Sequence, residues 1–316
     1  MPSSRRIDVH FHHIPPFYAD AVYAAGRGPA IGRYPEWTPE LALDLMDRSD
    51  IQVALTSLAQ PGVGFGSQSG AERLARRCND YAAELIARCP DRFGAFATVP
   101  MRSIEGAIRE IVHCLDELRF DGVSLFASYG ERFLGDAWFD PVLEALNDRS
   151  AVVFVHPGLH PSSATLALPW PGFMMEYLFD TTRAVVNLIF TRAIERYPRI
   201  QFILPHAGGL VPYFAWRLSV SPMIDKRLPQ LSREQVFADL AHFWYDNALA
   251  PGEQTFGALD HVARPERVVF GSDFPFANAR VIAEALRTHE SGLHTPERLA
   301  AIDRANALAL FPRLER

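Results

Sequence analysis

The sequence predicts an α/β fold, a (β/α)8 TIM barrel that occupies residues 1–316 as a single domain. Eight short runs rich in β-branched and aromatic residues recur along the chain, and an amphipathic stretch follows each of them. Several of these runs are almost continuously apolar, which is typical of strands buried on both faces of a parallel sheet. A doubly wound sheet is the alternative, but no GxGxxG motif follows the first run, and the barrel is therefore favoured.

The predicted strands cover residues 7–12, 52–58, 93–99, 122–128, 151–157, 201–207, 243–248 and 268–274. Helices are predicted where apolar residues recur at helical spacing, and Thr38 caps the first of them. These helices cover residues 38–50, 69–89, 103–119, 141–150, 181–198, 253–263, 278–290 and 296–310.

Three segments interrupt the alternation of strand and helix. Residues 13–37, 158–174 and 219–231 are rich in Pro and Gly and lack clear periodicity, so they are interpreted as loop insertions. The first two follow strands one and five. In a barrel they would lie over the carboxyl ends of the strands, where they could act as lids on a site.

Composition excludes several classes of function. The net charge of −6 provides no basic field for nucleic acid. No apolar run approaches the ~20 residues that span a bilayer, and the first residues lack the apolar segment of a secretory signal. The three cysteines have no CxxC spacing, and their odd number argues against a disulfide framework. A cytoplasmic globular protein without nucleic-acid or membrane partners is expected.

The first strand ends in the unusual sequence DVHFHH. Because side chains alternate along a strand, His10 and His12 point the same way, whereas His13 points to the other side and is expected to be packed or at the surface. The Cα atoms of His10 and His12 would be about 6.6 Å apart at a rise of ~3.3 Å per residue. Two imidazoles at this separation can bind one metal ion.

Three further strands end in a potential ligand or base. These residues are His156 in VVFVHP, His206 in FILPHAGG and Asp273 in VVFGSDFP. Each motif alone is more often structural, but barrel active sites are built at the carboxyl ends of the strands, and chance placement of all of them there is improbable. The sequence therefore predicts a metal site.

The five residues together resemble the amidohydrolase superfamily, whose metal-dependent hydrolases share the TIM barrel. The stretches DVHFHHIPP, FVHP, PHAGG and FGSDFP resemble the branch that contains aminocarboxymuconate-semialdehyde decarboxylase. DGVSLFASYG, AVVFVHP and HAGGLVPY are similar to 6-methylsalicylate decarboxylases. The resemblance spans essentially the whole chain and implies a metal-dependent, non-oxidative decarboxylase of a small hydroxylated aromatic or muconate-like carboxylic acid.

The resemblance also implies roles for the five residues. One divalent ion, preferably Zn²⁺ with Mn²⁺ as the alternative, is expected on His10, His12, His156 and Asp273. His206 is implied as the unligated catalytic base, and Asp273 has a second catalytic duty as the donor of a proton to the ring carbon.

A single lysine limits the number of metal ions. Binuclear members of the superfamily bridge two ions through a lysine at the end of strand four. Lys226 is the only lysine in this chain, and it follows His206, so one ion is expected. The chain departs from part of the branch in its first motif, because some benzoate-type decarboxylases begin with ExH where this chain has HxH. The identity of the acid that serves as substrate therefore stays open.

The resemblance also implies substrate-binding residues. They are Arg217, Trp170, Tyr129 and Phe276. The arginine lies in HAGGLVPYFAWR, at the spacing at which the aminocarboxymuconate enzyme uses an arginine from the neighbouring subunit, and this implies a homodimer. An arginine in a surface ion pair, and aromatic side chains that only fill the top of the barrel, are the alternatives.

Two rival functions stay open at this level. A hydrolase or lactonase would use the same ion to activate water, since one fold hosts both chemistries. A barrel that keeps a structural metal and only binds a ligand is disfavoured, because structural zinc sites usually fill all four positions within a compact cluster.

Overall fold

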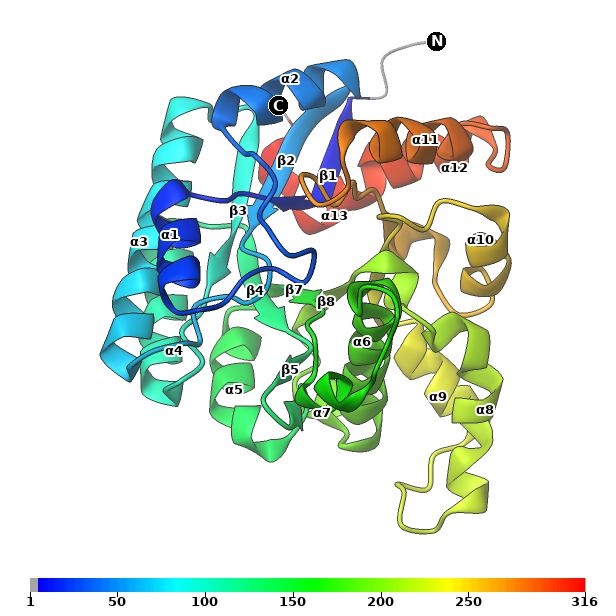
Figure 1. Cartoon of the computed structure of the whole chain (residues 1–316). Coiled ribbons are helices and arrows are strands. Elements are labelled where there is room, and N and C mark those ends of the chain that lie inside the picture. Colours follow the sequence, from blue (N-terminus) through cyan, green and yellow to red (C-terminus); the bar gives the residue numbers. More distant parts are fainter. Residues whose placement is uncertain (1–4, 316) are drawn as a thin grey trace.

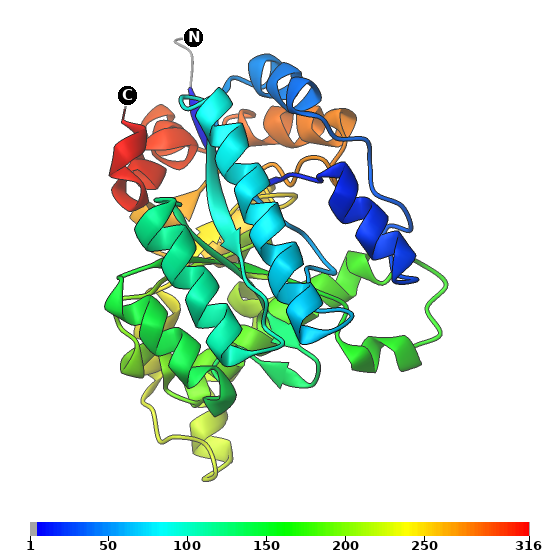
Figure 2. The ribbon, with the colours of Figure 1, turned by 90° about the vertical axis from the view of Figure 1, so that its left-hand side faces the viewer.

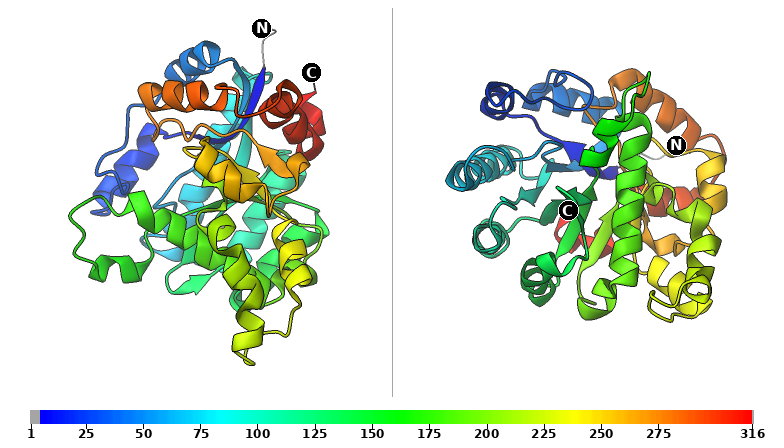
Figure 3. Two further views of the ribbon diagram at one scale, coloured as in Figure 1. Left: turned by 90° about the vertical axis from the view of Figure 1, so that its right-hand side faces the viewer. Right: turned by 60° about the horizontal axis from the view of Figure 1, so that its bottom comes forward.

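The structure is a computed structural model that describes residues 5–315. Eight parallel strands lie in the order β1-β2-β3-β4-β7-β8-β9-β10, and the predicted α/β barrel is confirmed. In the right-hand view of Figure 3 the helices surround these strands. The strands are β1 (Arg6–His12), β2 (Ile51–Ser57), β3 (Phe93–Thr98), β4 (Gly122–Phe126), β7 (Val152–His156), β8 (Gln201–Leu204), β9 (Trp244–Asp246) and β10 (Val268–Val269).

Backbone hydrogen bonds join the first strand to the chain at and after β10. The N–H of Val9 donates to the carbonyl of Phe270 at 3.0 Å, and the N–H of His12 donates to that of Phe274 at 2.7 Å. Between them, the N–H of Asp273 donates to the carbonyl of His10 at 2.8 Å. The two ends of the sheet therefore meet next to the residues that were predicted to bind a metal.

The outer layer consists of helices whose starts match capping rules. Thr38 caps α2 as predicted, and the side chains of Ser67 and Ser103 accept backbone N–H groups at the starts of α3 and α4. In Figure 2 the long helix α3 lies beside α4 on the outside of the strands. The principal helices are α1 (Pro16–Ala24), α2 (Pro39–Arg48), α3 (Gln68–Arg88), α4 (Ile104–Val112), α5 (Asp140–Asp148), α6 (Phe173–Phe190), α8 (Val211–Ile224), α9 (Arg233–Leu240), α10 (Glu253–Leu259), α11 (Ala279–His289), α12 (Pro296–Ala300) and α13 (Asn306–Leu310).

Several strands are shorter than predicted, β8, β9 and β10 most of all, and the ends of β8 and β10 affect the site. β8 ends at Leu204 because the next residue, Pro205, has no N–H to continue the ladder. β10 ends at Val269, and the chain then turns so that Asp273 has a φ of +63°. The polar residues after both strands are therefore presented by irregular backbone and not by regular strand.

The predicted insertions contain more helix than expected. Residues 16–24 form α1, which has a proline at its start and buries Tyr18 and Val22. Helix α8 continues to Ile224 despite Pro222 within it, and α6 begins at Phe173, before the predicted helix 181–198. The prediction of irregular structure was therefore wrong for these parts of 13–37 and 219–231.

The barrel interior below the histidines is filled by apolar side chains. Phe96 and Phe154 stack with ring centroids 5.4 Å apart, and Phe311 contacts Phe96 from the end of α13. Ile7, Val9 and Ile203 belong to the same buried cluster. This packed floor leaves the site open only toward the carboxyl ends of the strands.

The cysteines and the helices bear on two of the compositional expectations. Cys78, Cys89 and Cys114 are all free thiols. Among residues 5–315, no helix combines the length and apolar character needed to cross a bilayer.

Candidate metal centre

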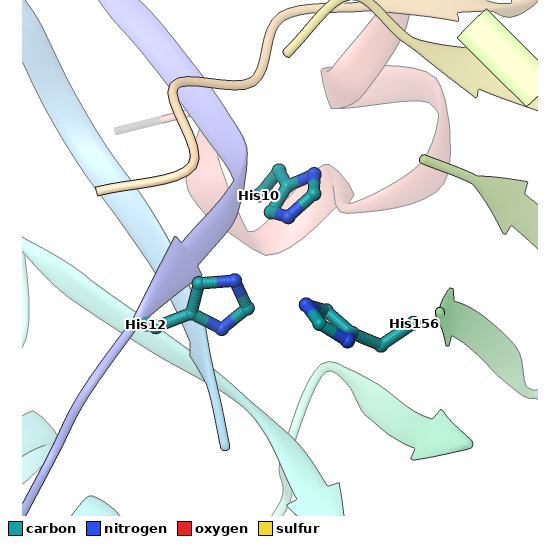
Figure 4. Close-up of side chains that lie close together, drawn as sticks. All are labelled: His10, His12 and His156. Carbon is teal, nitrogen blue, oxygen red and sulfur yellow. The ribbon is translucent and has the colours of Figure 1, made fainter. Parts of the chain in front are cut away.

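Three histidines converge at the carboxyl end of the barrel. His10 and His12 come from β1 and His156 from the end of β7, and their rings face one another in Figure 4. The ring centroids of His12 lie 5.1 Å from His10 and 4.9 Å from His156. One nitrogen of each ring lies within 4.8 Å of a nitrogen of both others. The HxH spacing therefore places the imidazoles of His10 and His12 together, and β7 adds the imidazole of His156 from across the barrel.

A break in the pairing of β1 with β2 accompanies this arrangement. The register of the two strands shifts between Asp8 and Phe11, around His10. Such irregularities redirect side chains and are frequent beside active sites. Behind the ring, Gly271 approaches so closely that a Cβ atom there would lie 2.7 Å from the Cβ of His10. A side chain at position 271 would therefore displace His10.

Asp273 completes the cluster. One of its oxygens, Oδ1, lies 3.2 Å from Nε2 of His12 and 3.4 Å from Nε2 of His10. The residue has a positive φ, which is uncommon for a residue other than glycine, and its N–H is bonded to the carbonyl of His10. That bond fixes the carboxylate in front of the histidines of β1.

His206 approaches the same carboxylate from the other side. Its Nε2 lies 3.6 Å from Oδ2 of Asp273, and with His10 and Asp273 it forms a second set of ligand atoms within 4.8 Å of one another. His206 follows β8 with a φ of +53°. The structure thus brings together all five residues that the sequence singled out for metal binding and catalysis.

Asp246 holds this arrangement from behind and was not predicted. Its Oδ2 accepts a hydrogen bond from Nδ1 of His10 at 2.8 Å, and its Oδ1 accepts the N–H of His206 at 2.9 Å. The N–H of Ala248 also donates to Oδ1 at 2.9 Å. One fully buried carboxylate therefore orients two residues of the centre. The available signal was that strand seven also ends in an acidic residue, in FWYDNA.

The charges around the histidines favour a cation. Burial lowers the pKa of His12 and, more strongly, that of His156, so both rings are neutral and able to act as ligands. Burial acts in the same direction on His10, but the carboxylates of Asp246 and Asp273 outweigh it and raise the pKa of His10 to about 10. Burial alone would raise the pKa of Asp273, yet the surrounding histidines lower it well below its usual range. Two buried carboxylates thus draw positive charge into the cluster.

The donor set fits a divalent metal ion. Apart from their contacts with Oδ1 of Asp273, the buried Nε2 atoms of His10 and His12 have no hydrogen-bond partner among residues 5–315, an arrangement that costs free energy unless a cation binds them. Because Nδ1 of His10 donates to Asp246, the lone pair of the neutral, metal-binding form of its ring would be on Nε2, which points into the cluster. Three imidazoles and one carboxylate are ligands that suit Zn²⁺ and also Mn²⁺.

A cavity of about 460 Å³ adjoins the cluster, a volume that suits a small molecule. His156, His206 and Asp273 form part of its wall, and most of the remaining wall is apolar. Parts of the first two predicted insertions contribute, through residues 29–31 and through Phe173 and Met174. The other lining residues are Ala59, Gln60, Tyr177, Leu178, Gly209, Leu210, Leu249, Ala250, Thr255 and Phe276.

Of the four predicted substrate-binding residues, only Phe276 lines this cavity. The Oη of Tyr129 accepts the N–H of Phe126 at 3.0 Å, and its ring packs on Phe139. Trp170 and Arg217 are exposed, in the loop after β7 and on α8 respectively. A direct role of Tyr129, Trp170 or Arg217 in substrate binding stays a prediction.

The comparisons with known proteins agree with this geometry. Residues 7–313 match the amidohydrolase family. A 6-methylsalicylic acid decarboxylase of Penicillium expansum is 36% identical over 315 residues, which cover 98% of this chain and 97% of that protein. A gamma-resorcylate decarboxylase of Rhizobium radiobacter is 27% identical over 291 residues, which cover 85% of each chain.

Solved structures show the same fold. The crystal structure of 5-carboxyvanillate decarboxylase from Novosphingobium aromaticivorans, complexed with manganese and 4-hydroxy-3-methoxy-5-nitrobenzoic acid, superposes with a TM-score of 0.86 at 22% identity. The match covers 97% of this chain and 96% of that one. With its barrel, its histidine and aspartate cluster and these matches along nearly its whole length, the chain belongs to the amidohydrolase family.

Proposed function

We propose that the protein is a metal-dependent, non-oxidative decarboxylase of a small aromatic acid that carries a hydroxyl next to its carboxyl group. The observation that carries the proposal is a cluster of two overlapping ligand sets, His10, His12 and His156 and His10, His206 and Asp273, beside an apolar cavity large enough for one substituted ring. The relatives support it, since 6-methylsalicylic acid and gamma-resorcylate both have a hydroxyl beside the carboxyl group.

The cluster would hold one divalent ion, with Zn²⁺ proposed ahead of Mn²⁺ because imidazole nitrogens predominate among the donors. An ion bound there would supply positive charge that stabilises the negative charge developing on the oxygens of the acid. The orientation of His10 by Asp246 makes Nε2 available for such an ion.

Asp273 and His206 account for the transfer of one proton to the substrate. In the proposed reaction Asp273 donates a proton to the ring carbon that bears the carboxylate. The bond from that carbon to the carboxylate then breaks, its electron pair restores the aromatic ring, and CO₂ leaves. Because the neighbouring histidines keep Asp273 ionised, its proton must be delivered, and His206 lies 3.6 Å away with Nε2 toward Oδ2. Water returns the proton to His206 after each turnover.

A substrate panel tests the proposal directly. Purified enzyme supplied with Zn²⁺ or Mn²⁺ is expected to convert 6-methylsalicylate to 3-methylphenol with one CO₂ released per acid consumed. 2-Methylbenzoate, which lacks the hydroxyl, is expected to react at least about 100-fold more slowly, because the carboxylate alone offers fewer oxygens to the positive charge. Hydrolysis of dihydrocoumarin without CO₂ release from any hydroxybenzoate would favour the rival hydrolase function.

We also propose that two copies of the chain associate through α8 and that Arg217 acts across this interface. The helix extends away from the barrel in Figures 1 and 3, and it exposes a stripe of apolar side chains at helical spacing. Tyr213, Trp216, Met223 and Ile224 are between 63% and 86% exposed, and Arg217 lies in the same stripe. No arginine or lysine of the described chain lines the cavity, so an acid bound there would gain a cationic partner from a second copy.

Two variants test this interface. Trp216→Glu is expected to convert a dimer into a monomer in analytical ultracentrifugation, because a carboxylate would be buried at the contact. Arg217→Ala is expected to keep the dimer and to raise KM for the acid by about 10- to 100-fold, the usual effect of losing a charged hydrogen bond. A monomeric wild-type enzyme, or an unchanged KM in Arg217→Ala, would contradict the corresponding half of the proposal.

A further inference from the structure

The cavity contains a polar pair that the proposed mechanism does not use. Gln60 follows β2 and Tyr177 lies in α6, and both line the cavity together with His156. The hydroxyl of Tyr177 donates to Oε1 of Gln60 at 3.0 Å. The carbonyl end of the amide is therefore engaged, and the amide nitrogen is the end that is left to interact with a ligand.

The amide nitrogen of Gln60 has no hydrogen-bond partner among residues 5–315, although Gln60 is half-buried. It lies close to the backbone just after the His156 ligand, since a Cβ on Gly158 would be 3.1 Å from it. The ring of Tyr177 is likewise near this ligand, with its centroid 6.2 Å from that of His156. The pair thus lies beside the metal centre and not at the distant end of the cavity.

The turn that carries Gln60 is held in place by two other tyrosines. The hydroxyl of Tyr18 donates to the carbonyl of Gly62 at 3.1 Å, and the hydroxyl of Tyr34 lies 3.4 Å from the carbonyl of Gln60 itself. Tyr18 is almost fully buried. On the opposite side, Asp180 accepts the N–H of Gly158 at 2.8 Å. The turn that carries Gln60 and the backbone at Gly158 are therefore both fixed before a ligand binds, which lowers the entropic cost of binding.

The surrounding wall explains what this amide would recognise. An aromatic acid is an anion at neutral pH, and within the described chain the cavity wall contains no arginine or lysine. The amide nitrogen of Gln60 can only donate hydrogen bonds, and the bond from Tyr177 fixes the side chain in that orientation. A carboxylate oxygen is the strongest acceptor that such a substrate offers.

We propose that Gln60 is a substrate-binding residue whose amide nitrogen donates a hydrogen bond to the carboxylate of the aromatic acid, with Tyr177 as the residue that positions it. This inference rests on the proposed decarboxylase function. It adds a carboxylate contact within one copy of the chain, separate from any contribution of Arg217.

Steady-state kinetics with 6-methylsalicylate and inhibition by its product, 3-methylphenol, test the inference. The product keeps the ring and the hydroxyl but has lost the carboxylate. Gln60→Ala is expected to raise KM for the acid by about 10- to 100-fold, and Gln60→Glu by at least as much, because a carboxylate there would repel the substrate. Tyr177→Phe is expected to raise KM by about 3- to 10-fold. The inhibition constant of 3-methylphenol is expected to change less than about twofold in all three variants.

Comparing KM for the acid with the inhibition constant of the phenol separates a lost contact with the carboxylate from general damage to the fold. Gln68→Ala, at an exposed glutamine on α3, is the matched control and is expected to behave as wild type. If KM and the inhibition constant rise together, or if KM does not change, Gln60 does not recognise the carboxylate and the inference is overturned. A wild-type enzyme that releases no CO₂ would instead overturn the proposed function, so the two failures are distinguishable.

Discussion

Asp273→Asn is expected to lower kcat/KM for decarboxylation by at least about 1,000-fold, within the range that proton-donating residues contribute. Asp273 is the only carboxylate of the described chain that joins the histidines in the candidate ligand sets, and it lies within 3.6 Å of Nε2 of His10, His12 and His206. An amide there neither carries the proton to the ring carbon nor balances the charge of a bound cation. The measurement is CO₂ release from 6-methylsalicylate at saturating metal.

The metal content of the same variant divides the two roles of Asp273. A variant that binds metal with wild-type affinity but does not turn over would assign the effect to the proton, whereas loss of metal would assign it to coordination. Asp225→Asn, at a carboxylate outside the site that pairs with Arg227, is the control and should leave activity unchanged. An Asp273→Asn enzyme that retains a tenth or more of wild-type kcat/KM would contradict both roles.

Asp246→Asn is expected to weaken metal binding by about 10- to 100-fold, the usual effect of losing a carboxylate that orients a ligating histidine. The backbone N–H groups of His206 and Ala248 would keep the asparagine oxygen at the position of Oδ1. The new NH₂ group would then face Nδ1 of His10, which must turn its lone pair toward it and move its proton to Nε2. That nitrogen could no longer bind a metal. Competition with a chromophoric chelator measures the change.

A second buried aspartate and histidine pair provides a matched control for Asp246. Nε2 of His289 lies 2.9 Å from Oδ1 of Asp303, and neither residue lines the cavity. Asp303→Asn is expected to lower the free energy of unfolding while leaving the metal affinity of the folded enzyme within about twofold of wild type. Equal losses of metal affinity in the two variants, or none in Asp246→Asn, would show that Asp246 does not act through His10.

The sequence was most informative about the histidines and the aspartate that fall at the ends of predicted strands. The alternation of side chains in β1 was enough to pair His10 with His12, and the parallel barrel placed His156, His206 and Asp273 at the same rim. These inferences use only local periodicity and one topological rule. For that reason the fold and the central cluster could be predicted without coordinates.

The residues that were missed depend on contacts between distant parts of the chain. Asp246 and His10, which form a hydrogen bond, are 236 positions apart in the sequence. Gln60 and Tyr177, which form another, are 117 positions apart. Nothing in the periodicity of either segment distinguishes these side chains from ordinary strand or helix residues. The positive φ angles of His206 and Asp273 were missed because tertiary hydrogen bonds accompany them, whereas Pro205, which ends β8, was visible in the sequence.

The bond from the N–H of Asp273 to the carbonyl of His10 has a consequence for biosynthesis. The two partners are 263 positions apart in the sequence, so the centre cannot be assembled on the ribosome until the segment that carries Asp273 has been made. Nascent or prematurely terminated chains would carry the histidines of β1 without the aspartate that completes the cluster. Only molecules whose barrel has closed would therefore contain a complete catalytic centre.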